Sequence, residues 1–115
     1  MKMNKEIKEK WIAALRSGDY AQGEEALCKQ DYNSKEYHFC CLGVLCDLSN
    51  PSRWHHEGDN NSLYEFENGI YENEMPTRDF LESLGIAWNT AETLANMNDV
   101  GEPFSEIATY IEENL

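Results

Sequence analysis

The stretch that decides the fold is His38-Phe39-Cys40-Cys41-Leu42-Gly43-Val44-Leu45-Cys46-Asp47-Leu48, the longest apolar run in the chain. Its composition predicts a helix over residues 40–48 with apolar side chains on nearly every side, so other elements must cover most of it. Asn50-Pro51 follows, and because proline disfavours helical geometry in the residue before it, we expect the helix to end there. Gly43 has no side chain, and we expect it to let the helix that carries Trp11 approach closely.

The three cysteines of this run fit two interpretations, a buried helix or a thiol site. On a helix, Cys40 and Cys41 would point about 100° apart, and Cys46 lies five residues further on. This spacing does not match the Cys-x(2–4)-Cys turns that hold structural zinc. We therefore predict buried thiols that act as small hydrophobic groups, and no metal site. A catalytic cysteine paired with His38 or His55 is the remaining alternative.

Helices are predicted on both sides of the apolar run. Residues 4–17 have an apolar stripe at three- and four-residue spacing, with Asn4 to cap the start and Gly18 to end it. Shorter helices are predicted after Pro76-Thr77, from Thr90 through Met97, and over residues 103–113. We expect Asn98-Asp99 to cap the junction before the last of these helices.

Strand signals lie in two places. Residues 26–28 and 37–39 flank a segment rich in turn-forming residues and predict one hairpin. Residues 62–66 alternate in polarity and are followed by Asn-Gly and residues 69–72, which predicts a second hairpin. Residues 1–115 are therefore predicted to form one small α+β domain, in which four to five helices surround a central apolar helix beside one or two β-hairpins.

The charge is unevenly distributed. The chain has nine basic and 22 acidic side chains, a net charge of −13. Residues 1–35 hold seven of the basic and six of the acidic side chains, so residues 36–115 hold sixteen acids against Arg53 and Arg78. Such a surface repels phosphate backbones, so nucleic-acid binding through a basic face is not expected. The acidity serves solubility, or it forms a patch for a basic partner or a mimic of nucleic acid.

Several other classes of protein are also disfavoured. No segment approaches the ~18 consecutive apolar residues of a membrane span, and the first residues have no secretory signal. Cysteines in a chain that is not secreted are expected to be reduced thiols in the cytoplasm. The sequence has no Gly-rich phosphate loop, Walker lysine or nucleophile elbow. We therefore predict a non-enzymatic protein with no cofactor and no catalytic residues.

Two groups of side chains suit a flat ligand. Arg16, Tyr20 and Gln22 follow one another at the end of the first helix, and Arg53 and Trp54 place an arginine beside a ring. Arginine on phosphate and aromatic stacking on a planar ring are common in nucleotide sites. These five residues are the predicted ligand-binding residues. The alternative is that Trp54 packs on the core and Arg53 pairs with a glutamate.

The segments of residues 10–23 (KWIAALRSGDYAQG) and 39–48 (FCCLGVLCDL), with residues 94–111, resemble a family of small uncharacterised proteins encoded by bacteriophages and prophages. The resemblance implies a phage accessory protein in the host bacterial cytosol. Small phage proteins often block host defence, either as oligomeric sponges for cyclic nucleotide signals or as acidic inhibitors of host proteins. The first hypothesis is a homo-oligomer that sequesters a nucleotide immune signal. The alternative is an acidic inhibitor, or nucleic-acid mimic, that binds a host defence protein directly.

Overall fold

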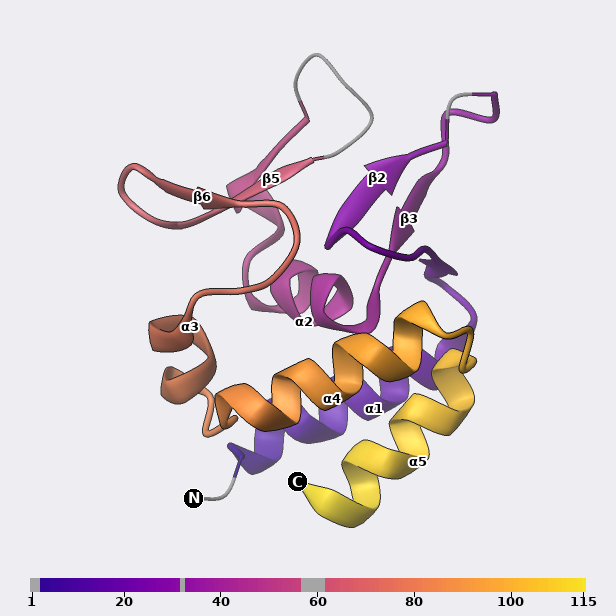
Figure 1. Cartoon of the computed structure of the whole chain (residues 1–115), viewed down its shortest axis with the longest axis vertical. Coiled ribbons are helices and arrows are strands. Elements are labelled where there is room, and N and C mark those ends of the chain that lie inside the picture. The colour runs from indigo at the N-terminus through magenta and orange to yellow at the C-terminus, as the bar shows by residue number, and fades with distance from the viewer. Residues whose placement is uncertain (1–2, 32, 57–61) are drawn as a thin grey trace.

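Helix α2 (Cys41–Ser49) lies at the centre of the computed structural model, which describes residues 3–31, 33–56 and 62–115 (Figure 1). Within these residues four further α-helices and two three-stranded sheets surround it. The helices are α1 (Lys5–Ser17), α2, α3 (Arg78–Ser83), α4 (Trp88–Asp99) and α5 (Phe104–Asn114), with a short 3-10 helix at Pro51–Arg53. The predicted α+β fold around a central apolar helix is confirmed.

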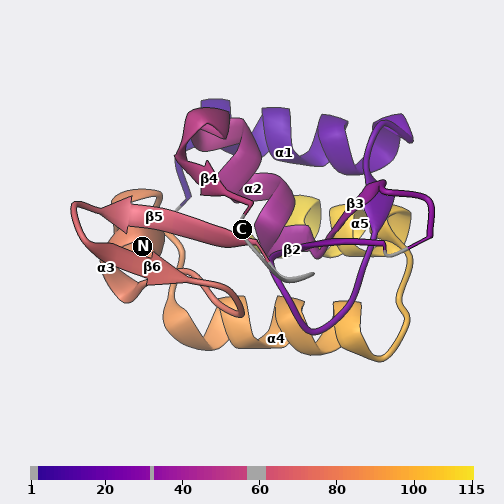
Figure 2. The ribbon, with the colours of Figure 1, turned by 90° about the horizontal axis from the view of Figure 1, so that it is seen from above.

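The sheets lie on one side of α2, and helices α1, α4 and α5 lie on the other (Figures 1 and 2). The first sheet has the order β1-β3-β2, with β1 parallel and β2 antiparallel to β3. The second is antiparallel and has the order β4-β5-β6. The strands are β1 (Ala21–Gln22), β2 (Cys28–Gln30), β3 (Tyr37–Phe39), β4 (Trp54–His55), β5 (Leu63–Glu67) and β6 (Ile70–Glu72).

The apolar run forms α2 because its neighbours bury it completely over its first two turns. Residues 41–46 are all buried, and α1 and α4 both pack on this helix. The indole Nε1 of Trp11 donates a hydrogen bond to the carbonyl oxygen of Cys41 at 2.9 Å. At the start of the helix, the sulfur of Cys40 accepts a hydrogen bond from the amide of Gly43 at 3.4 Å. One thiol therefore serves as a helix cap.

Gly43 does allow a close approach, but the expected neighbour was wrong. A Cβ atom at Gly43 would lie 1.7 Å from the carbonyl oxygen of Leu27, so the segment that enters β2, rather than α1, crosses here. The same carbonyl accepts a hydrogen bond from the amide of Cys40 at 3.2 Å. Leu27 therefore reaches the first turn of α2 through its backbone, which requires glycine at position 43.

The helix ends follow the predicted signals with small shifts. Asn4 Oδ1 accepts a hydrogen bond from the amide of Ile7, and Gly18 adopts a left-handed φ of 82° where α1 ends. Thr77 caps α3, and α4 begins at Trp88, two residues before the predicted Thr90. Both hairpins are present. Strands β1 and β4, of two residues each, were not predicted.

Asn98 and Asp99 do not cap α5 as expected, because both side chains are used elsewhere. Asn98 is fully buried, donates to the carbonyl of Gly23 at 2.7 Å, and accepts from the amide of Cys41 and the side chain of Gln22, both at 3.1 Å. The amide of Phe104, at the start of α5, donates instead to Gln22 Oε1 at 3.2 Å. The three segments of the family resemblance thus meet at Asn98.

No helix in the described ranges is long and apolar enough to cross a membrane.

Candidate functional site

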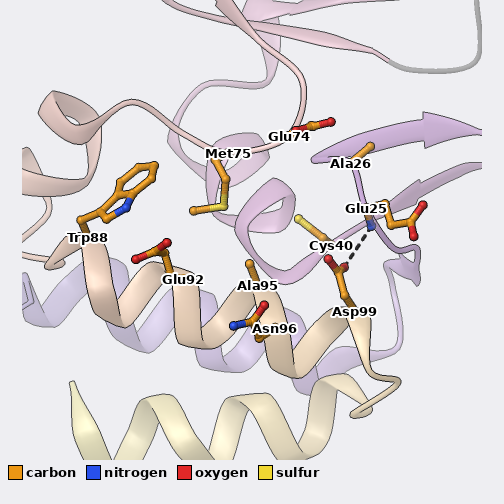
Figure 3. Close-up of a pocket in the computed structure, with 10 residues that line it drawn as sticks. All are labelled: Glu25, Ala26, Cys40, Glu74, Met75, Trp88, Glu92, Ala95, Asn96 and Asp99. Carbon is orange, nitrogen blue, oxygen red and sulfur yellow. Dashed lines mark hydrogen bonds between the residues drawn. The ribbon is translucent and has the colours of Figure 1, made fainter.

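A pocket of about 450 Å³ opens between α4 and three segments that pack opposite it (Figure 3). We call it the α4 pocket. One of its walls is a face of α4, and the other is formed by the turn before β2, the start of α2 and the segment after β6. The α4 wall consists of Trp88, Glu92, Ala95, Asn96 and Asp99, and the opposite wall of Glu25, Ala26, Cys40, Glu74 and Met75.

Helix α4 packs on the core with one face and lines the pocket with the face beside it. Ala91, Leu94 and Asn98 are buried toward the core, while the pocket residues recur at intervals of three and four along the neighbouring face. The buried stripe fixes the helix against α2, and the face beside it is left open. One wall of the pocket is therefore the helix face beside the buried stripe.

The turn that carries Glu25 is fixed to α4 by a hydrogen bond. The amide of Glu25 donates to Oδ1 of Asp99 at 3.0 Å (Figure 3). Glu25 has a φ of 68°, a left-handed conformation that is uncommon for a residue with a side chain. The amide of Leu27 then donates to the carbonyl of Asn73 at 2.8 Å. These bonds hold the turn before β2 against both α4 and the end of β6.

The lining of the pocket is acidic and partly apolar. Four of its ten described residues are carboxylates, and none of the ten is lysine, arginine or histidine. Between the carboxylates lie the apolar side chains of Ala26, Met75, Trp88 and Ala95. Charges next to apolar walls are less screened than charges in open water. This combination suits a cation on an apolar stem, such as the side chain of lysine or arginine.

Trp88 already contacts one cation of the chain itself. The guanidinium carbon of Arg78, at the start of α3, lies 4.5 Å from the centre of the Trp88 ring, within the range of a cation–π interaction. Arg78 is not among the lining residues of the pocket.

The thiols are buried, as predicted for small hydrophobic groups. All four cysteines are buried and free, and burial raises the pKa of Cys28 and of Cys40 to about 11. Burial also raises the pKa of Cys41 and Cys46 well above the ordinary value. The thiol form, a weak nucleophile, therefore dominates at neutral pH. Within the residues that the structure describes, no three His, Cys, Asp or Glu side chains are grouped to hold a metal ion.

Two of the five predicted ligand-binding residues lie close together. The hydroxyl of Tyr20 donates to Oδ2 of Asp47 at 2.5 Å, and Nε1 of Trp54 donates to Oδ1 of the same carboxylate at 3.0 Å. The Phe39 ring lies between them, 5.1 Å from Tyr20 and 5.9 Å from Trp54 between ring centres. Burial, followed by the hydrogen bond to Asp47, raises the pKa of Tyr20. Trp54 also packs edge-on against the buried Tyr64.

The other three predicted residues make separate contacts. Arg16 pairs with Glu112 on α5 at 3.3 Å. Gln22 is used in the Asn98 network and donates to the carbonyl of Glu102 at 2.7 Å. Arg53 donates to the main-chain oxygen of Glu65 at 3.4 Å rather than to its carboxylate. The structure therefore brings together Tyr20 and Trp54, and directs the other three side chains to different partners.

The α4 pocket was not predicted from the sequence. The spacing of Trp88, Glu92 and Asp99 on one helical face was a usable signal, because residues three and four apart share a face. The opposite wall comes from segments near residues 25, 40 and 74. Nothing in the local sequence of those segments indicates that they meet.

Comparison with known proteins places the chain in a family without naming an activity. No curated protein and no solved structure matches the chain. The family described as a domain of unknown function, DUF8296, matches residues 3–115, and the chain belongs to that family.

Proposed function

We propose that this protein is a non-enzymatic phage accessory protein that counters bacterial defence by binding a basic region of a host protein in its α4 pocket. The observation that carries the proposal is the lining of the pocket, where the described residues include four carboxylates and no basic side chain around the apolar ones. The phage setting and the host cytosol come from the resemblance of residues 10–23 and 39–48 to phage and prophage proteins.

The charge of the rest of the chain supports this proposal. The basic side chains are concentrated in the N-terminal third, and two of them, on α1, contact α5. Arg16 pairs with Glu112, and Nζ of Lys8 donates to the main-chain oxygen of the same residue at 3.4 Å. The remainder of the chain carries a large excess of acid. The negative electrostatic potential of this acidic surface speeds the approach of a basic partner and disfavours the binding of anionic ligands.

The experiment is capture of a host protein by the full-length chain, immobilised in bacterial lysate, with the retained protein identified by mass spectrometry. We expect retention at about 50 mM salt and release at about 500 mM, because salt screens attraction between exposed charges. Added cyclic nucleotides should not release the partner. A Glu74→Gln/Glu92→Gln variant should lose it. Equal retention by this variant and the native chain would overturn the proposal.

The nucleotide-binding hypothesis remains a second proposal, supported by the proximity of Tyr20, Phe39 and Trp54. In this version the protein is a homo-oligomer that sequesters a cyclic nucleotide signal. The carboxylate of Asp47 lies between the two predicted residues and would repel phosphate, which is why this proposal ranks second. Calorimetry with a panel of cyclic di- and trinucleotides tests it, and absence of heat at micromolar protein would eliminate it.

A further inference from the structure

We infer that the group bound in the α4 pocket is an arginine side chain of the partner, held between the ring of Trp88 and the pocket carboxylates. This inference rests on the proposed function and names the chemistry of the bound group. It starts from the ring of Trp88, which is the aromatic wall of the pocket.

Trp88 takes a guanidinium on one face in the folded chain itself. Arg78 lies over the ring at 4.5 Å and is not a lining residue of the pocket. The same ring lines the pocket, and its negative π-density can attract a guanidinium there as it attracts Arg78. This contact is independent of the carboxylates and identifies the ring as a partner for guanidinium.

Carboxylates lie along the pocket on both sides of a path that begins at the Trp88 ring. Glu92 follows Trp88 by four residues on α4, one helical turn away, and Figure 3 shows both side chains at the same end of the pocket, beside Met75. The Asp99 and Glu25 side chains lie toward the other end, near Cys40 (Figure 3). An extended side chain lying along Met75 and Ala95 would thus have apolar contact along its stem and negative charge at its head.

Arginine fits this arrangement better than lysine does. Its guanidinium is planar, stacks on aromatic faces and donates in two directions to a carboxylate, while the lysine ammonium is compact and more strongly hydrated. The volume of about 450 Å³ lies toward the lower end of the range of about 300–1,000 Å³ for ligand pockets. The pocket is therefore sized for a side chain and its flanking backbone.

The test is a titration of the ¹⁵N-labelled full chain with two peptides, acetyl-Gly-Ser-Arg-Ser-Gly-amide and its lysine counterpart, followed by nuclear magnetic resonance. The indole Nε1–H signal of Trp88 is assigned by its loss in Trp88→Phe. We expect the arginine peptide to shift this signal and to bind at least about fivefold more tightly than the lysine peptide. Equal affinity for the two peptides, or no shift of the Trp88 signal at millimolar peptide, would overturn the inference.

Two variants separate stacking from simple charge attraction. Trp88→Leu should bind the two peptides equally, and its dispersed spectrum will show whether the fold is retained. Arg78→Gln is the control, because it removes the guanidinium that already contacts Trp88 and changes no lining residue. Its preference for the arginine peptide over the lysine peptide should stay within about twofold of that of the native chain. If Glu74→Gln/Glu92→Gln loses the host protein while both peptides bind the native chain alike, the arginine inference fails and the proposed function stands.

Discussion

The side-chain oxygen of Asn98, on α4, accepts a hydrogen bond from the backbone amide of Cys41 at the start of α2, with a distance of 3.1 Å. Asn98 is fully buried, and its amide nitrogen donates to the carbonyl of Gly23 at 2.7 Å. One side chain therefore connects α4, α2 and the segment before β2. These elements also contribute to the walls of the α4 pocket, so Asn98 holds part of the opposite wall against α4.

Replacing Asn98 by alanine should reduce the free energy of unfolding by about 2–4 kcal/mol, because it leaves the amide of Cys41 and the carbonyl of Gly23 buried without this partner. Urea unfolding followed by circular dichroism measures the change. Asn96→Ala, at an exposed position on the same helix, is the control and should change stability by less than about 0.5 kcal/mol. Similar losses in the two variants would contradict the role given to Asn98.

Gly43→Ala should destabilise the protein by at least about 2 kcal/mol, because the added methyl group would overlap the backbone of Leu27 and force the packed segments apart. Alanine is otherwise the better helix former, so a loss of stability must come from this contact. The urea midpoint of Gly43→Ala, compared with that of Asn89→Ala at an exposed position on α4, measures it. A midpoint equal to or above that of the native chain would show that the two segments do not approach so closely.

Stability should fall as the pH rises from 9 to 11. Burial raises the pKa of Cys28 and Cys40 from 9.0 to about 11, so in this range the unfolded chain loses thiol protons that the folded chain keeps. The unfolded state then binds fewer protons, and the free energy of unfolding decreases with pH. The raised pKa of Tyr64, about 12, acts in the same direction at higher pH.

The pH effect is measured by urea midpoints at pH 8, 9 and 10. Repeating the series in about 0.5 M salt separates buried thiols from surface charge, because salt screens exposed charges far more than buried groups. The decline should persist in salt. A midpoint that stays constant up to pH 10 in high salt would contradict the burial of the thiols.

Removing two pocket charges should not harm the fold. Glu74 and Glu92 are exposed, and none of the described lining residues beside them is basic, so Glu74→Gln/Glu92→Gln should change the free energy of unfolding by no more than about 0.5 kcal/mol. Thermal unfolding measured at low salt tests this. A loss of more than about 1 kcal/mol would show that these carboxylates stabilise the fold. Weaker binding by the variant could then come from the altered fold instead of from the missing charges.

The sequence predicted the elements of the fold well because their signals are local. The stripe and caps of residues 4–17, the apolar run before Asn50-Pro51 and the alternation of residues 62–66 each specify one element through its own side chains. Strands β1 and β4 were not predicted, because two residues are too few to show an alternation of polar and apolar side chains. Leu27 was expected in a strand, but its amide donates a hydrogen bond to the carbonyl of Asn73, which belongs to neither strand of that hairpin.

Long-range contacts explain where the sequence-based interpretation of the site differed from the structure. Polar residues such as Gln22 and Asn98 look alike whether they bind a ligand or hold the backbone, and only the fold shows that they bind each other. Asp47 likewise gave no sign that Tyr20 and Trp54 would both donate to it. Predicting the pocket would also have required knowledge of long-range contacts, since its walls come from segments that are distant in sequence.

In the proposed function, the α4 pocket, rather than the overall negative charge, binds the partner. The most direct test is calorimetry of the host protein recovered by capture against two variants that remove the same charge. Glu74→Gln/Glu92→Gln alters the pocket, whereas Glu9→Gln/Glu113→Gln alters exposed positions outside it. We predict that at about 150 mM salt the pocket variant binds at least about tenfold more weakly than the native chain, and the surface variant within about twofold. Equal weakening in the two variants would contradict the claim.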